Sequence, residues 1–394
     1  MQEDIIEHGA GEAPAMRDRA PVLLQVLPAM EAGGVERGTA DIARAAAEHG
    51  WISLVASEGG RMEADLMRGG AEHITLPLKA KSPLAIRANA ARLARLIRER
   101  GVDIVHARSR APAWSALLAA RRTGTPFVTT YHSAYGEANI FKRLYNSVMI
   151  RGDRVIATSN FLLSVMKERY SFDHAKLRLI HRGVDLKRFN ASAVSAERLI
   201  KLANDWRLPD GVPVIMLPGR LTRLKGQHVL LEALAGMKEM EFIALIVGND
   251  KGRGSYRQEL ERMATDLGLA SKVRLLESCS DMPCAYMLAD VVVSASIEPE
   301  GFGRVAVEAQ AMGRPVIATG HGGSRETVLP GRTGWLVGPN DAGTLARALR
   351  EALSLDANAR ATMAMAARRH VEEKFSLERM CNATLLVYEE LLRR

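Results

Sequence analysis

Short runs of consecutive apolar residues alternate with helical patterns along the first half of the chain. The segments between the runs repeat apolar residues at the three- and four-residue spacing of a helix, for example over Thr39–His49 and Ile86–Arg100. Ser159 stands where it could cap a further helix, Asn160–Tyr170. This alternation predicts a parallel sheet with helices on both faces. Its predicted strands are Val22–Leu27, Ile52–Ala56, Ile104–His106, Phe127–Thr130 and Arg154–Thr158.

A second alternating set follows a break in the pattern. Leu177–Asn190 closes the first set, and a polar helix at Ala196–Trp206 leads to the proline-bounded stretch Pro209–Pro213. The sequence therefore predicts an α/β fold with two Rossmann-like domains, at 20–195 and 196–375, between a mobile tail at 1–19 and a last helix at 376–394. Ligands bind such sheets at the carboxyl ends of their strands, so facing domains would form an interdomain cleft. The predicted strands of the second set are Val214–Leu217, Phe242–Val247, Val273–Leu276, Val291–Ala295 and Pro315–Ala318.

The composition is that of an ordinary globular protein of two or three domains, with 394 residues, 47% of them hydrophobic and 25% charged. No apolar run approaches the roughly 18 residues of a membrane-spanning helix, and the N-terminus lacks the apolar core of a signal peptide. The three cysteines, Cys279, Cys284 and Cys381, lack the spacing of zinc ligands and predict reduced thiols. We expect a cytoplasmic protein.

The positive charge is concentrated in one part of the chain. The net charge is +9, but residues 79–188 alone hold 22 Lys and Arg against 7 Asp and Glu. Such a distribution favours an anionic partner on one side of the molecule. Nucleic acid is not expected, because no nucleic-acid-binding motif is present and only 5% of the residues are aromatic. An anionic membrane surface or lipid acceptor fits better, and a solubilising face is the alternative.

The segment Ser294–Thr319 carries the densest candidate chemistry. Glu300 and Glu308 stand eight residues apart, and a Gly-Phe-Gly turn that includes Phe302 and Gly303 lies between them. A strand, a glycine turn and a helix N-terminus together form an anion site. Two carboxylates would repel a phosphate there unless they bind something else, and sugar hydroxyls suit them. The segment predicts a nucleotide-sugar site, with a solvated helix face as the alternative.

Two cations follow the predicted strand Val214–Leu217, within the segment GRLTRLKG. Arg220 offers a bidentate fork and Lys225 a point charge, so together they could clamp a pyrophosphate. Cations held there would stabilise the charge that develops on a departing diphosphate. The chain contains no Asp-x-Asp pair, so neither a metal ion nor another cofactor is expected. Surface charge is the alternative for both residues.

These elements together resemble the donor-site signature of the retaining glycosyltransferases of family 4. The resemblance rests on the Glu-x7-Glu element with its Gly-Phe-Gly turn, on Gly33-Gly34 and on GRLTRLKG, and it covers about residues 20–390. It implies the GT-B fold and a last helix that crosses back onto the first domain. It also implies that the Gly33-Gly34 loop approaches the donor phosphate, that Glu300 binds the donor sugar and that Glu308 binds the nucleotide ribose.

The resemblance assigns further residues and a reaction course. A functional histidine of the family, near the donor sugar's 6-hydroxyl, corresponds to His132. Arg108 and Arg110 could bind carboxylates or phosphates of the acceptor, and a solvated loop is their alternative. His106 is expected to be structural or acceptor-side, and His181 structural. In a retaining enzyme of this kind, the acceptor hydroxyl enters on the face from which the diphosphate leaves, and a diphosphate oxygen takes the proton.

The segment HARSRAPAW and the basic first domain resemble bacterial lipopolysaccharide-core transferases. We therefore expect a metal-independent hexosyltransferase on the inner face of the cytoplasmic membrane, moving mannose from GDP-mannose to a Kdo-lipid A type acceptor. The stretch FKRLYNSVMIRG, with Lys142, Arg143 and Arg151, predicts an amphipathic membrane-surface helix or an ordinary packing helix. The alternatives are an exopolysaccharide or soluble-sugar transferase that uses a UDP-sugar, and a non-catalytic membrane-bound partner subunit with the same fold.

Overall fold

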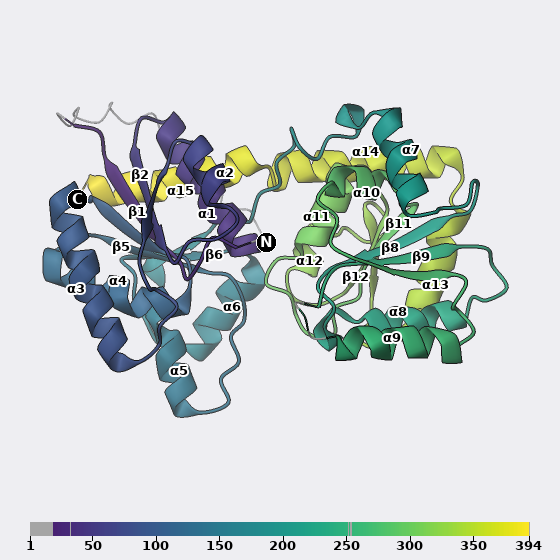
Figure 1. The fold of residues 1–394 in the computed structure, drawn as a ribbon, viewed down its shortest axis with the longest axis horizontal. Helices are drawn as coiled ribbons and strands as arrows, with labels where there is room; N and C mark the ends of the chain where they lie inside the picture. Colours follow the sequence, from purple (N-terminus) through teal and green to yellow (C-terminus); the bar gives the residue numbers. More distant parts are fainter. Residues whose placement is uncertain (1–18, 32, 251, 253, 394) are drawn as a thin grey trace. The chain divides into compact units, whose positions relative to one another are not determined.

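A computed structural model describes residues 19–31, 33–250, 252 and 254–393 (Figure 1). The tail expected at 1–19 lies almost wholly outside the described residues. By its contacts the chain divides into two compact units, Met1–Val128 with Thr384–Arg394, and Thr129–Ala383. The domain boundaries expected at 195/196 and 375/376 stay predictions.

The first sheet has seven strands among the described residues, in the order β3-β2-β1-β4-β5-β6-β7. The pairings of β1 with β2 and β4, of β2 with β3, and of β6 with β7 are parallel. Helix α1 (Gly34–Glu48) begins five residues before the predicted start, with Gly33 at its N-cap. Ser159 does cap α6, accepting a hydrogen bond from Leu162 N at 3.1 Å. The strands are β1 Val22–Val26, β2 Ile52–Ser57, β3 Glu72–Thr75, β4 Ile104–Ala107, β5 Phe127–Tyr131, β6 Arg154–Ala157 and β7 Leu177–Leu179; the other helices are α2 Glu63–Arg68, α3 Pro83–Arg100, α4 Arg110–Thr123, α5 Ile140–Asn146 and α6 Asn160–Arg169.

The second sheet has six strands among the described residues, in the order β10-β9-β8-β11-β12-β13, all with parallel pairings. Its chain order reverses between β8 and β11, which is where ligands bind in open α/β sheets. The strands are β8 Val214–Pro218, β9 Ile243–Val247, β10 Val273–Leu276, β11 Val291–Ser294, β12 Val316–Thr319 and β13 Gly334–Val337; the helices are α7 Ala196–Asp205, α8 Gln227–Ala235, α9 Ser255–Asp266, α10 Met282–Leu288, α11 Arg304–Ala311, α12 Ser324–Thr327, α13 Ala342–Ser354 and α14 Ala357–Lys374.

Apolar residues cover both faces of this second sheet. Along β8, Ile215 and Leu217 pack into one core, whereas Val214 and Met216 pack into the other. Helices α8, α9 and α13 lie on one side of the sheet, and α10, α11 and α14 lie on the opposite side (Figure 1). A strand buried on both faces reads as a continuous apolar run, which is why this sheet could be predicted from the sequence. The predicted α/β class with two Rossmann-like sheets is confirmed.

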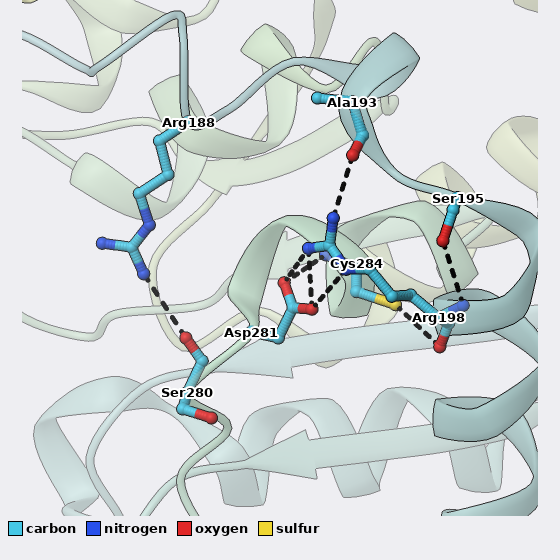
Figure 2. Close-up of polar contacts among 7 residues, drawn as sticks. All are labelled: Arg188, Ala193, Ser195, Arg198, Ser280, Asp281 and Cys284. Carbon is cyan, nitrogen blue, oxygen red and sulfur yellow. Dashed lines mark hydrogen bonds and ion pairs between the residues drawn. The ribbon is translucent and has the colours of Figure 1, made fainter.

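Helix α7, which lies between β7 and β8 in the sequence, is fixed to α10 by one arginine (Figure 2). Arg198 donates to both carboxylate oxygens of Asp281, with its Nη2 2.8 Å from Oδ1 and 2.7 Å from Oδ2. Asp281 in turn caps α10, and the thiol of Cys284 in that helix donates to Arg198 O at 3.3 Å. Burial raises the pKa of the Cys284 thiol, so this cysteine stays protonated and packs as a small apolar residue.

The last helix, α15 (Leu377–Leu392), contributes a fully buried tyrosine to the first unit. Tyr388 lies with its ring centroid 5.8 Å from that of Trp51, and its hydroxyl is 2.6 Å from Nδ1 of His106. Burial, followed by the charge of Arg108, holds the pKa of His106 well below its usual range. The imidazole is therefore neutral and structural. Across the described residues, no helix is long and apolar enough to cross a membrane.

Candidate active site

The loop that follows β8 and the loop that follows β11 contact each other at the carboxyl ends of these strands. The backbone N–H of Ile297 donates to Leu224 O at 3.0 Å, which ties one loop to the other. Gly226 has a φ of +67°, and a Cβ at this position would lie 1.9 Å from Ala295 O. Only glycine permits both the backbone angle and this approach. The close contact places the side chain of Lys225 over the loop that carries Glu300.

Lys225 and Glu300 form an ion pair that is three-quarters or more buried. The Lys225 Nζ lies 2.7 Å from Glu300 Oε1, and the hydroxyl of Ser296 donates to the same oxygen. Burial raises the pKa of Glu300, but the Lys225 ammonium, the Ser296 hydroxyl and the charge of His321 outweigh it and leave the pKa below its ordinary value. Glu300 is thus held as a carboxylate. Its second oxygen, Oε2, accepts no hydrogen bond from the described residues and can accept from a ligand hydroxyl.

Arg220 differs from Lys225 in having no such partner. Its side chain is exposed at the end of β8, and its guanidinium makes no hydrogen bond or ion pair with any residue that the structure describes. Its main-chain oxygen accepts from the buried side chain of Gln227 at 2.9 Å, which fixes the backbone. One cation of the predicted clamp is therefore open to an anion, and the other is balanced by Glu300.

The Gly-Phe-Gly turn opens helix α11 without a side-chain cap. Gly303 is the N-cap residue, with a φ of +91°, and among the described residues no side chain makes a capping hydrogen bond there. Phe302 is buried, and its ring packs against those of His181 and Phe375. A donor could therefore meet Phe302 only through its backbone, whereas its side chain belongs to the core. The turn supplies the positive end of a helix dipole three residues after Glu300.

Glu308, which is buried in α11, is held by two neighbours. The hydroxyl of Tyr286 donates to Oε2 at 3.0 Å, and the guanidinium of Arg304 donates to Oε1. Burial, reinforced by the Glu308 charge, raises the pKa of Tyr286 well above its usual value, so the tyrosine remains a donor. Each carboxylate oxygen can accept a further hydrogen bond, so Glu308 can still take ribose hydroxyls.

His132 lies against the same turn through its backbone. A Cβ on Gly301 would come within 2.4 Å of His132 O, so only glycine allows the two segments to approach. The structure thus brings His132 beside the residue that follows Glu300. The remaining expected site residues belong to the first unit. There, Gly33 caps α1 and Gly34 begins it, Arg108 is buried, and Arg110 is the first residue of α4. Burial of Arg108 disfavours the solvated-loop alternative for that residue.

Sequence reasoning missed Glu326, in α12. Its carboxylate accepts hydrogen bonds from the backbone N–H groups of Asn160 and Phe161 at 2.8 and 2.9 Å and lies 2.8 Å from His181 Nε2. Burial raises the pKa of Glu326, but these bonds outweigh it and lower the pKa overall. His181 is structural, as expected. Nothing in the sequence indicates that Glu326 contacts residues 145 to 166 positions away.

His321 was missed as well. It lies in the Gly-His-Gly-Gly loop after β12, and its charge lowers the pKa of Glu300. A histidine between glycines at a strand end was a signal that could have found it. Within the described part of the chain, no group of three or more His, Cys, Asp or Glu could hold a metal ion. The arrangement is suited to an anion flanked by a hydroxyl-rich ligand.

Two family models match the chain in succession. Residues 32–188 match "Glycosyltransferase Family 4", and residues 200–370 match "Glycosyl transferases group 1". A D-inositol 3-phosphate glycosyltransferase of Salinispora arenicola is 32% identical over 310 residues, which cover 73% of this chain and 68% of that protein.

Solved structures resemble the whole chain. A glycosyltransferase of Rickettsia africae is 38% identical, with a TM-score of 0.89 and coverage of 95% of this chain and 99% of that one. HepE of Anabaena, solved with UDP and glucose, is 25% identical with a TM-score of 0.80, covering 94% of this chain and 98% of its own.

Proposed function

Because this chain belongs to glycosyltransferase family 4 and has the GT-B fold, we propose that it is a retaining, metal-independent hexosyltransferase acting on an anionic acceptor. The observation that carries the proposal is the buried pairing of Lys225 with Glu300 beside the glycine-capped start of α11. This pairing joins a cation to a carboxylate that can accept from hydroxyls, three residues before a helix N-terminus. A nucleotide sugar likewise carries an anionic diphosphate next to a sugar with hydroxyl groups.

In the proposed reaction, an acceptor hydroxyl attacks the anomeric carbon from the face on which the diphosphate departs. The new carbon–oxygen bond forms as the bond to the phosphate oxygen breaks, and the acceptor proton passes to the departing diphosphate. Arg220, Lys225 and the first turn of α11 stabilise the charge left on that diphosphate. Glu300 positions the sugar through its hydroxyls, Glu308 the ribose, and His132 the far side of the sugar.

Charge and one relative support our proposal for the acceptor class. The Salinispora relative is named for D-inositol 3-phosphate, a phosphate-bearing polyol. A Kdo-lipid A type acceptor, our finer expectation, also carries phosphates and carboxylates. Either would suit the net charge of +15 on residues 79–188. We propose a phosphate-bearing acceptor. UDP-glucose and GDP-mannose both stay open as donors, and HepE, solved with UDP and glucose, favours testing the former.

Helix α5 supports an acceptor at a membrane. Ile140, Phe141 and Leu144 are 76, 80 and 55% exposed, and Lys142 stands among them. Exposed apolar side chains with a neighbouring cation suit the headgroup region of an anionic bilayer. Arg143 does not share this role, because its guanidinium donates to Arg169 O. We propose that α5 rests on the inner face of the cytoplasmic membrane.

Mass spectrometry of products tests the reaction. The protein is incubated with UDP-glucose, UDP-N-acetylglucosamine or GDP-mannose, each with inositol phosphate or a lipid A precursor. We expect one donor–acceptor pair to give a product with retained anomeric configuration, and Glu300→Gln to abolish it. The Arg223→Met variant is the matched control, since Arg223 lies on the same loop but pairs with Glu259 instead. Binding of no donor by the wild-type protein would favour the non-catalytic subunit.

Vesicle co-sedimentation tests the membrane. Binding should rise with anionic lipid and fall steeply between low and high salt, because charges are screened over about 10 Å at 0.1 M salt. The double variant Phe141→Ser/Lys142→Glu should bind several-fold less, with donor hydrolysis unchanged. Met365→Ser, which alters an equally exposed apolar side chain on α14, should bind like the wild type. Equal binding to neutral vesicles, or none, would favour a soluble acceptor such as that of an exopolysaccharide enzyme.

A further inference from the structure

The loop between β12 and α12 is built around the backbone of Glu300. The N–H of Gly323 donates to Glu300 O at 2.9 Å. A Cβ on Gly322, whose φ is +59°, would lie 2.4 Å from the same oxygen, and a Cβ on Gly323 would lie 2.5 Å from the Cα of Phe302. Neither glycine can be replaced without moving the loop that carries Glu300 and Phe302. The residue that these contacts hold in place is His321, whose own N–H donates to Thr319 O at 2.8 Å.

The imidazole of His321 is left without a hydrogen-bond partner. Both ring nitrogens are buried, and neither bonds to any residue that the structure describes. A buried polar group that makes no hydrogen bond is destabilising, so native proteins keep few of them without a reason. Each ring nitrogen can donate or accept one hydrogen bond, and a bound ligand can supply the partner.

One carboxylate oxygen of Glu300 also lacks a hydrogen-bond partner among the described residues. Its Oε1 already accepts from Lys225 and Ser296, whereas Oε2 accepts from none of the described residues. The close approach of Gly322 and Gly323 to Glu300 and Phe302 places His321 next to the loop that carries this carboxylate. A phosphate oxygen would satisfy an N–H of the imidazole, but it would meet the carboxylate with like charge. A hydroxyl satisfies both, because it can donate to the carboxylate while accepting from the imidazole.

We propose that His321 is a specificity-determining residue that binds a hydroxyl of the donor sugar together with Glu300 Oε2. The inference rests on the proposed function, since it names a contact within the same donor site. The hydroxyl then has one hydrogen-bond acceptor, Glu300 Oε2, and one donor, the imidazole of His321. A sugar that lacks this hydroxyl leaves Glu300 Oε2 and the buried imidazole without that partner, and such sites reject their deoxy analogues strongly.

The test compares the His321→Phe variant with the wild type, because phenylalanine keeps a ring of similar size and removes both nitrogens. The Kd of the bare nucleoside diphosphate and of the nucleotide sugar are measured by calorimetry, and KM and kcat by product formation. We expect the nucleotide sugar to bind about 3- to 10-fold more weakly, as the loss of one hydrogen bond predicts. The bare diphosphate should bind within twofold of the wild type. His174→Phe, at an exposed position, is the matched control.

A panel of donors deoxygenated at single sugar positions completes the test. The wild type should discriminate strongly against one deoxy donor, and His321→Phe should discriminate against it clearly less, because only Glu300 Oε2 still binds that hydroxyl. Melting of the ligand-free variant should not fall, because no hydrogen bond is lost. Unchanged discrimination, or equal weakening of the bare diphosphate, would overturn the assignment. If the wild type binds neither diphosphate nor nucleotide sugar, the proposed function itself fails, which is a distinct outcome.

Discussion

Replacing Lys225 by Met leaves the carboxylate of Glu300 buried without its cation. Breaking a fully buried ion pair costs about 3–5 kcal/mol. The two side chains here are 25 and 20% exposed, so solvent screens part of this, and we expect a loss of about 2 kcal/mol. Thr129–Ala383 forms the unit concerned, and for a domain near this size that loss lowers the melting temperature by roughly 4–8 °C.

The loss of stability in Lys225→Met should depend on pH. In the wild type the pKa of Glu300 lies below its ordinary value of 4.5, so its contribution to stability is full above 4.5 and disappears as pH falls through the lowered pKa. Without Lys225, burial dominates and raises the pKa of Glu300 above 4.5. The variant is then destabilised most at neutral pH, and its deficit shrinks as pH falls and the carboxyl becomes neutral.

Thermal melting between pH 7 and pH 4 measures the effect, and a second substitution checks its cause. Lys225→Met/Glu300→Gln removes both charges, so it should recover most of the lost stability while remaining inactive. Arg223→Met, which breaks the exposed pair with Glu259, should cost no more than about 1 kcal/mol. Wild-type melting of Lys225→Met, or additive losses in the double variant, would refute the reasoning.

Three further outcomes are expected. Arg220→Ala should lower turnover by roughly two to three orders of magnitude with unchanged melting, because the exposed guanidinium supports an anion rather than the fold; near-wild-type kcat would contradict this. Activity should persist in excess EDTA, and rescue of a lost activity by magnesium or manganese would reveal a metal requirement. Glu326→Gln should weaken folding at pH 7 by about 1–3 kcal/mol. Because the pKa of Glu326 is lowered, that deficit should shrink as pH falls below 4.5; a pH-independent deficit in melting would contradict its cause.

Most strands were predictable from their apolar runs, but two edge strands were not. The predicted strand Val273–Leu276 has the observed bounds, and most others agree within a residue or two. By contrast, Glu72–Thr75 and Gly334–Val337 were missed, and each is one of the two edge strands of its sheet. The first is polar and half-exposed, and the second begins with a glycine, so neither has the apolar run that marks a central strand.

By itself the sequence determined the alternation of strands and helices and the parts of the site that lie close together along the chain. Glu300, Gly303 and Glu308 lie on one turn and one helix, so their spacing is fixed by local geometry. The chemical types needed for a diphosphate and a sugar could likewise be recognised without a structure, as Arg220 and Lys225 were.

Only the tertiary structure decided which of these groups meet. Lys225 and Glu300 are 75 residues apart, and their pairing depends on a close backbone approach at Gly226 that no periodicity encodes. The same holds for His321, which reaches Glu300 through two glycines that admit no Cβ, and for Glu326 with its distant partners. Burial is a property of the packed molecule, because it arises only when separate segments exclude water together. It shifts the pKa of these groups, and it leaves the His321 nitrogens without partners among the described residues.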